Sequence, residues 1–346
     1  MQIAFVAPAP LETPVGGFFY TDRIIAGLRD AGHAVDLVEL SGAHPQADVE
    51  ARGMARAALD AATQRGVRLL IDGLALAAFV GLGDRLEAAC AFGLVHHPAA
   101  LADGASEADR AVLRNAALRL LPRLRRVVVT SQIVADRLMA EFGVDAARIV
   151  VVVPGTADAP RGSGSGGPGC AILSVGALIP RKGHDVLLRA LARLFDLDWR
   201  LTVVGSATRD PAHAASLAAL ADELHIATQV RFAGVLDQPA LDALWRNTDL
   251  FALASHWEAY GNAVAEALRR GLPVAVTSGG AAGALVPAEA GVVAPPGDVE
   301  QLSKAMRRLI FSAELRAEMA AVAWQAGRAL PDWATQVRAF AAALES

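Results

Sequence analysis

Short, almost uninterrupted apolar runs alternate along this chain with longer stretches in which apolar residues recur at helical spacing. In the first half, the runs predict strands at residues 3–7, 35–39, 68–71, 91–96, 126–130 and 149–153. Strands with continuous apolar residues are typical of a parallel sheet that is covered on both faces. Helices are expected between them, for example at residues 20–31 and 47–65. This order predicts a doubly wound, Rossmann-like α/β domain.

The composition changes at residues 155–169, where glycine, serine and proline dominate. Because Gly and Pro both oppose helix formation, this segment predicts a flexible linker between two domains. After it the rhythm restarts, with strands predicted at 171–175, 200–204, 230–232, 250–254 and 273–276. We therefore expect domains at 1–154 and 170–331, and a final helix at about 332–346 that packs back on the first domain.

Composition and charge exclude several classes of protein. Of the 346 residues, 54% are hydrophobic and 20% are charged, which predicts a globular fold. The net charge of −4 argues against nucleic-acid binding. Cys90 and Cys170 form no zinc or disulfide motif, and each is expected to be a small buried residue. The chain opens on a predicted strand and has no apolar run long enough for a bilayer, so a soluble, cytoplasmic protein is expected.

The segment 255–266, SHWEAYGNAVAE, carries the strongest chemical signal. It follows a predicted strand and opens a predicted helix near Gly261, with carboxylates at Glu258 and Glu266. If helical rise applied throughout, the carboxylates would stand roughly 10 Å apart, about the span from a sugar ring to a ribose across a diphosphate. Free N–H groups at the helix start would bind the diphosphate itself. The alternative is a plain helix with one N-terminal and one surface glutamate.

A second signal lies at residues 173–188, LSVGALIPRKGHDVLL, where a predicted strand leads into Arg181 and Lys182 and then a helix. Cations at the carboxyl end of a parallel strand face the crevice in which such sheets bind ligands. There they would stabilise the charge that grows on a diphosphate leaving group. A solvated basic turn is the alternative.

Weaker candidates come from the first half of the chain. Gly16 and Gly17 follow the first strand and would let a ligand approach the backbone, although they form no dinucleotide fingerprint. His96 and Asp72 each end a predicted strand, where a side chain can face the ligand crevice. The alternative for each is a structural role, which for Asp72 would be to cap the next turn. The candidate acceptor contacts are Tyr20, Asp72 and His97.

Other motifs are absent or weak. The chain contains no P-loop and no GxSxG motif. Asp196 and Asp198 form the one plausible DxD, and its place at a helix end predicts a cap, so no metal or other cofactor is expected. The arginine-rich stretch 110–126 fits an anionic membrane or acceptor, but a solvated helix face is favoured and membrane contact is not expected.

Taken in order, these motifs resemble the retaining glycosyltransferases of family 4, which have the GT-B fold of two Rossmann-like domains facing a central cleft. The resemblance covers nearly the whole chain. Its most specific part is the block 230–298, with RFAGVL, DLFALASHWEAYGNAVAEAL, GLPVAVTSGG and AGVVAPPGD. The resemblance implies that Glu258 binds the donor sugar, that Glu266 binds the ribose, and that the backbone near Val235 binds the base.

By the same resemblance, Lys182 contacts the diphosphate and His96 reaches the donor sugar from the N-terminal domain. Gly16 and Gly17 match the family's glycine loop near the phosphate and acceptor. The catalytic residues implied are His96, Lys182 and Glu258. The further donor-binding residues expected are Arg181, Tyr260, Gly261 and Asn262.

The chain departs from the family pattern at Ala177, where many members have an arginine of the diphosphate clamp, and Arg181 is expected to stand in for it. The resemblance implies a hexose transfer with retention, from a nucleotide-diphosphate sugar to the hydroxyl of a small-molecule, glycan or lipid acceptor. A UDP-sugar is expected because it is common in the family. The alternatives are a GT-B nucleotide-sugar epimerase or hydrolase, and a catalytically silent scaffold that binds a nucleotide sugar.

Overall fold

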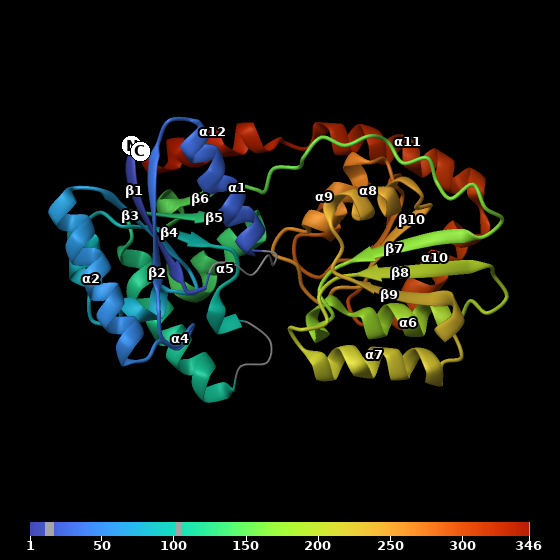
Figure 1. Ribbon diagram of the computed structural model, residues 1–346, viewed down its shortest axis with the longest axis horizontal. Helices are drawn as coiled ribbons and strands as arrows, with labels where there is room; N and C mark the ends of the chain where they lie inside the picture. Colours follow the sequence, from blue (N-terminus) through green and yellow to red (C-terminus); the bar gives the residue numbers. More distant parts are fainter. Residues whose placement is uncertain (11–16, 102–105, 346) are drawn as a thin grey trace. The chain divides into compact units, whose positions relative to one another are not determined.

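The computed structural model describes residues 1–10, 17–101 and 106–345. It divides into two compact units (Figure 1). Unit 1 comprises Met1–Gly155 and Trp333–Ser346, and unit 2 comprises Thr156–Asp332. Unit 2 begins at Thr156, within the segment 155–169 that was expected to be a linker, and the chain returns to unit 1 at Trp333.

Unit 1 is built on a parallel sheet, which forms because its strands are almost entirely apolar. In the described part of the unit, six strands pair in the order β2-β1-β3-β4-β5-β6. They are β1 Gln2–Pro8, β2 Ala34–Leu40, β3 Arg68–Asp72, β4 Phe92–Val95, β5 Arg126–Val129 and β6 Ile149–Val151. All six strands were expected from the apolar runs, and their ends differ from the expected ones by at most two residues.

Helices cover both faces of this sheet. On one face, α1 (Gly17–Asp30) and α12 (Trp333–Glu345) pack together, and Tyr20, Phe340 and Leu344 join Phe5 and Leu94 in one buried cluster. The helices of the opposite face are α2 Val49–Arg65, α4 Glu107–Leu120 and α5 Gln132–Phe142 (Figure 1). A short helix, α3 (Gly83–Ala88), precedes β4. The C-terminal helix is therefore part of the core of unit 1.

Unit 2 contains a second parallel sheet, with the strand order β12-β11-β10-β7-β8-β9 among the described residues. Its strands are β7 Cys170–Val175, β8 Trp199–Val204, β9 Val230–Gly234, β10 Leu250–Leu253, β11 Val274–Thr277 and β12 Gly291–Ala294. The edge strand β12 was not among the expected strands. Its apolar run is only four residues long, and Val293 within it is exposed.

Alternate residues of each strand enter different layers of unit 2, as the two-residue period of a strand requires. Ala252 packs with the cluster under α6, α7 and α10, whereas Phe251 and Leu253 pack with the cluster under α8, α9 and α11. These helices are α6 His184–Ala192, α7 Pro211–Glu223, α8 Gln238–Arg246, α9 Asn262–Arg269, α10 Val299–Phe311 and α11 Ala313–Ala329. Both faces of the sheet are therefore buried.

The strand order reverses direction at one place in each sheet, and such switch points open a crevice at the carboxyl ends of the strands. In unit 2 the switch lies between β7 and β10. In unit 1 it lies between β1 and β3. The loops that follow these four strands are therefore where ligand-binding side chains are expected.

The Gly/Ser/Pro segment differs from the flexible linker expected of it, because its backbone is tied to unit 2. Gly162 N donates to Arg270 O at 2.9 Å, and Ser165 N and Oγ donate to the Asp249 carboxylate at 3.0 and 2.6 Å. At its start, Thr156 N donates to Pro331 O at 2.8 Å. The segment makes no helix or strand, and it obtains its order from backbone and hydroxyl hydrogen bonds instead.

The arginine-rich stretch lies on α4 and the turn after it. Arg114 pairs with Glu141 at 3.4 Å, and Arg123 pairs with Asp84 and Glu87. These carboxylates offset part of the basic charge. Within the described ranges, no helix combines the length and the apolar content that a membrane span requires.

Candidate functional site

The loops after β7 and β10 meet at the switch point of unit 2. The β7 loop ends at Gly183, whose φ of +59° suits glycine and which lies against Ala254 at the end of β10. A Cβ at Gly183 would stand 2.0 Å from Ala254 O, so glycine is required for this close approach. His256 N also donates to Arg181 O at 2.8 Å. The two loops are thus joined backbone to backbone.

This junction brings together a carboxylate and two cations. Lys182 Nζ donates to Glu258 Oε1 at 2.5 Å, and Arg181 Nη1 lies 3.5 Å from Glu258 Oε2. The Glu258, Lys182 and Arg181 side chains are 9%, 15% and 28% exposed. The sequence placed these three residues in two separate motifs, and the sheet order makes them neighbours.

The charges decide the protonation state of Glu258. Burial by itself would raise the pKa of this carboxyl. The charges of Lys182 and Arg181 and hydrogen bonds from Lys182 and Ser255 outweigh burial, so the pKa of Glu258 lies below its ordinary value. Glu258 is therefore an ionised hydrogen-bond acceptor at neutral pH, and it is suited to holding hydroxyl groups.

A third loop holds the backbone of Glu258 in place. Glu258 N donates to Gly279 O at 3.0 Å, and Ala281 N donates to Glu258 O at 2.8 Å. Gly280 has a φ of +74°, and a Cβ there would lie 2.1 Å from Glu258 O. This loop follows β11, so three neighbouring strands contribute to the position of one carboxylate.

Two hydroxyl groups that the sequence analysis did not single out belong to the same arrangement. Ser255 Oγ donates to Glu258 Oε1 at 2.7 Å, and Thr277 Oγ1 donates to Ser255 O at 2.5 Å. Ser255 lies three residues before Glu258, so its local spacing could have revealed it. Thr277 comes from the next strand, and only the sheet order brings it here.

Helix α9 begins beside this carboxylate. Gly261 is its N-cap residue with φ +111°, and Asn262 is its first residue. The Asn262 Oδ1 atom is buried without a hydrogen-bond partner. Because Glu258 precedes the helix, helical rise applies only from Asn262 to Glu266. The expected separation of roughly 10 Å between the two carboxylates assumed helix throughout, so it does not follow from this geometry.

The other residues expected to bind the donor are spread around the same edge of the sheet. Tyr260 is 6% exposed, and burial raises the pKa of its phenol to about 12. Glu266 is half-buried one turn into α9. Val235 follows β9 and is 71% exposed. Arg181 was expected to replace the family arginine absent at Ala177, but its Nη1 donates to Trp257 O at 2.5 Å and faces Glu258.

A second polar group lies at the carboxyl ends of β3 and β4 in unit 1. His96 Nε2 lies 4.0 Å from Asp72 Oδ2 and 3.2 Å from Thr21 Oγ1. Asp72 Oδ1 also accepts from Leu74 N at 2.8 Å, which is the turn-capping role weighed for it. Burial raises the pKa of Asp72 to about 6 and lowers the pKa of His96 to about 4. His96 is therefore neutral at pH 7.

The remaining candidate residues of unit 1 differ in burial and in their contacts. Tyr20 is 1% exposed and its hydroxyl donates to Val152 O at 3.0 Å, so it is a core residue and offers no free polar atom to an acceptor. His97 follows His96 and is half-buried. Gly17 begins α1. Gly16 lies outside the described residues.

The DxD pair does not cap a helix as expected. Asp196 accepts two hydrogen bonds from Arg307, both at 2.7 Å, so its carboxylate links the turn after α6 to α10. Asp198 lies beside Gly169 instead. Among the described residues, no three His, Cys, Asp or Glu side chains gather closely enough to hold a metal ion.

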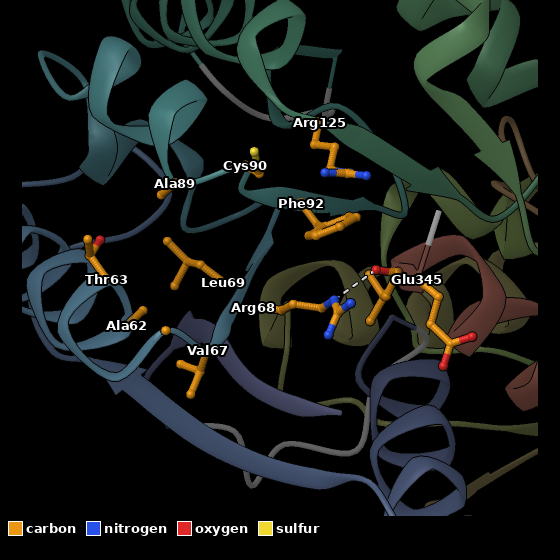
Figure 2. A pocket seen from close by; sticks show the side chains of 12 residues that line it. Ala62, Thr63, Val67, Arg68, Leu69, Ala89, Cys90, Phe92, Arg125 and Glu345 are labelled. Atoms are coloured by element: carbon orange, nitrogen blue, oxygen red, sulfur yellow. Dashed lines mark hydrogen bonds between the residues drawn. The ribbon is translucent and has the colours of Figure 1, made fainter.

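Unit 1 also contains a cavity of about 410 Å³ at the amino ends of β3 and β4, where Arg68, Leu69 and Phe92 line it (Figure 2). It is bordered by the C-terminal ends of α2, α3 and α12, where Arg68 Nε donates to Leu344 O at 3.0 Å. Helix C-termini carry partial negative charge, which disfavours an anion. Cys90 lines this cavity and is exposed, which corrects the expectation that it is buried.

Among the comparisons with known proteins, the match to a family model lies entirely within unit 2. Residues 161–325 match the family model described as "Glycosyl transferases group 1". This match covers most of unit 2, Thr156–Asp332, and does not extend into unit 1. The matched residues include Arg181, Lys182, Glu258 and Glu266, so the ion cluster lies inside the matched segment.

Relatives with assigned names are similar over part of the chain. The D-inositol 3-phosphate glycosyltransferase of Thermomonospora curvata is 32% identical over 229 residues, which are 59% of this chain and 53% of the relative. The chain thus spans about half the length of this relative.

Solved structures match the fold over nearly all of both chains. Sucrose-phosphate synthase from Thermosynechococcus elongatus superposes with a TM-score of 0.82 at 18% identity, and covers 99% of this chain and 97% of that one. Anabaena HepE in complex with UDP-glucose gives a TM-score of 0.78 at 20% identity, covering 100% and 99%. The fold is therefore GT-B, with two Rossmann-like units, as predicted.

Proposed function

We propose that this protein transfers a hexose from a nucleotide-diphosphate sugar, with UDP as the nucleotide, to a hydroxyl group of an acceptor. The observation that carries the proposal is the cluster of Glu258, Lys182 and Arg181 at the switch point of unit 2, inside the segment that matches the group 1 model. The ionised carboxylate can accept hydrogen bonds from the sugar hydroxyls of such a donor. The two cations can bind its phosphates.

In this proposal each group has a distinct task. The cations of Lys182 and Arg181 neutralise the diphosphate as negative charge grows on it. Glu258 accepts hydrogen bonds from the sugar hydroxyls, and Glu266 accepts them from the ribose. The backbone N–H groups at Gly261 and Asn262 add positive potential at the start of α9. Val235 provides backbone for the base.

The reaction proposed retains the anomeric configuration. The bond between the anomeric carbon and the leaving phosphate oxygen breaks, and a bond from that carbon to the acceptor oxygen forms on the same face. The acceptor's proton passes to the departing diphosphate. The UDP-glucose complex of Anabaena HepE, a protein of the same fold, supports the choice of UDP. The role of His96 toward the donor sugar and the absence of a metal requirement stay predictions.

Thermal unfolding with UDP, GDP and ADP sugars tests the donor site. A ligand at 100 times its dissociation constant should stabilise the protein by ~2.7 kcal/mol, which gives a readily measured rise in Tm. We expect this rise with one nucleotide class, and we expect Glu266→Ala to remove it because the ribose loses its acceptor. The exposed Glu318 on α11 supplies the control, since Glu318→Ala should keep the full rise. Wild-type protein that responds to no nucleotide sugar would contradict the proposal.

A further inference from the structure

Arg209 lies beside the candidate site in the loop that follows β8, the strand next to β7. The two loops are in backbone contact. Gly176 N donates to Val204 O and Leu178 N donates to Ser206 O, both at 2.9 Å. A Cβ at Gly205 would stand 2.0 Å from Gly176 O, so the β8 loop lies directly against the start of the β7 loop.

The position of Arg209 within this loop is fixed on both sides. Before it, Thr208 N donates to Ser206 Oγ at 3.2 Å, and the Ser206 and Thr208 hydroxyls lie 2.9 Å apart. After it, Asp210 caps α7 by accepting from His213 N at 2.9 Å. The Asp210 carboxylate is therefore engaged with the helix start, and Arg209 stands between two ordered turns.

The charge of Arg209 is not offset by the protein. Within the described part of the chain, no carboxylate forms an ion pair with its guanidinium. Partial desolvation and the positive charge of Arg181 both lower the pKa of Arg209, which places the two guanidinium groups within electrostatic reach of each other. Like charges held close together are unfavourable unless an anion neutralises them.

The neighbouring groups do not supply that anion. Glu258 is shared by Lys182 and Arg181, at 2.5 and 3.5 Å. His184 at the start of α6 is buried, which lowers its pKa to about 4, so it is neutral at pH 7. Its Nδ1 and the Nε2 of His213 are buried without hydrogen-bond partners, so this edge of the sheet also has unsatisfied polar groups.

We propose that Arg209 binds the diphosphate of the donor and supplies a further cation beside Lys182 and Arg181, which share Glu258. The inference rests on the proposed function, because the anion is taken to be the donor's diphosphate. A guanidinium forms two parallel hydrogen bonds with phosphate oxygens, which an exposed arginine next to a second cation can do without rearranging its loop. The arginine that is absent at Ala177 therefore needs no substitute from the β7 loop.

Calorimetric titration of Arg209→Gln with inorganic pyrophosphate, UDP and uridine tests the assignment. A hydrogen bond to a charged group contributes enough that its loss should weaken UDP and pyrophosphate binding by about 10- to 100-fold. Uridine affinity should not change, because uridine carries no phosphate. Arg308→Gln is the matched control, since Arg308 is exposed near the C-terminus of α10, and binding by this variant should equal that of the wild type.

The possible outcomes distinguish a failure of the role of Arg209 from a failure of the proposed function. Unchanged UDP affinity in Arg209→Gln, or an equal loss in Arg308→Gln, would overturn the role of Arg209 and leave the proposed function standing. Wild-type protein that binds pyrophosphate but not UDP would overturn the proposed function. In that case a loss of pyrophosphate binding in Arg209→Gln would still assign the residue to an anion site. If the wild type binds neither pyrophosphate nor UDP, both the role of Arg209 and the proposed function are overturned.

Discussion

Replacing Lys182 by alanine should lower kcat/KM by about 30- to 1,000-fold, which corresponds to ~2–4 kcal/mol of lost transition-state stabilisation. Lys182 Nζ is held 2.5 Å from Glu258 and is only 15% exposed, so its charge acts where water screens it weakly. Glu258→Ala should have an effect of similar size, because it removes the acceptor for the sugar hydroxyls and the counter-ion of Lys182. Initial rates of nucleoside diphosphate release measure both effects.

The chain provides a natural control for this experiment. Its only other lysine is Lys304, which is exposed on α10 and pairs with Glu300 at 2.6 Å. Lys304→Ala should keep near-normal rates, because a surface pair contributes little. Near-normal turnover by Lys182→Ala would remove that residue from the catalytic site. Thermal unfolding of each variant separates loss of chemistry from loss of fold.

Asp72 and His96 should each make the stability of unit 1 depend on pH, but in opposite directions. Variants that lack one of the two residues should therefore show a pH dependence that the wild type does not. The pKa of Asp72 rises from 3.8 to about 6 on folding, so its contribution is complete below pH 3.8 and is lost as the pH rises through 6. The pKa of His96 falls from 6.5 to about 4, so its contribution is complete above pH 6.5 and is lost as the pH falls through 4.

In the wild type these two contributions oppose each other between pH 4 and 6. Each amounts to about 3 kcal/mol, from shifts of a little over two pKa units. Asp72→Asn leaves only the histidine, so the free energy of unfolding should rise by about 3 kcal/mol from pH 4 to 6.5, relative to the wild-type profile. His96→Asn leaves only the aspartate, so it should fall by a similar amount over pH 4 to 6.

Urea unfolding followed by fluorine NMR of 5-fluorotryptophan-labelled protein makes this measurement. Trp333 is the one tryptophan in unit 1, so its signal reports that unit separately. Asp22→Asn is a suitable control, because Asp22 is exposed on α1 and its profile should follow the wild type. Parallel profiles for Asp72→Asn and His96→Asn would show that neither group titrates as described.

Local sequence patterns predicted most of the fold because parallel strands bury both faces, and a continuous apolar run is easy to recognise. The exception, β12, is an edge strand of four residues, and so short an apolar run does not by itself indicate a strand. The Gly/Ser/Pro segment was misjudged for a related reason. Composition shows that a segment lacks a core of its own, but it does not show that Ser165 and Gly162 have hydrogen-bond partners on unit 2.

The candidate site was predicted in pieces. Lys182 and Glu258 each came from the end of an apolar run, where local sequence is informative. Their contact depends on β7 and β10 being neighbours, which follows from strand order rather than from either motif. Thr277 and Arg209 were missed because each acts from a different strand. Tyr20 was misassigned because a tyrosine whose hydroxyl bonds a distant carbonyl looks the same in sequence as an exposed one.

The chain enters and leaves unit 2 at one point. Thr156 N donates to Pro331 O at 2.8 Å, and Arg269 Nη2 donates to both Thr156 O and Leu330 O. A segment whose two ends lie side by side can be exchanged as a cassette, because a replacement needs only the same short spacing between its ends. Unit 2 is therefore a transplantable part, which recombination could replace between residues 155 and 333 without lengthening either connection.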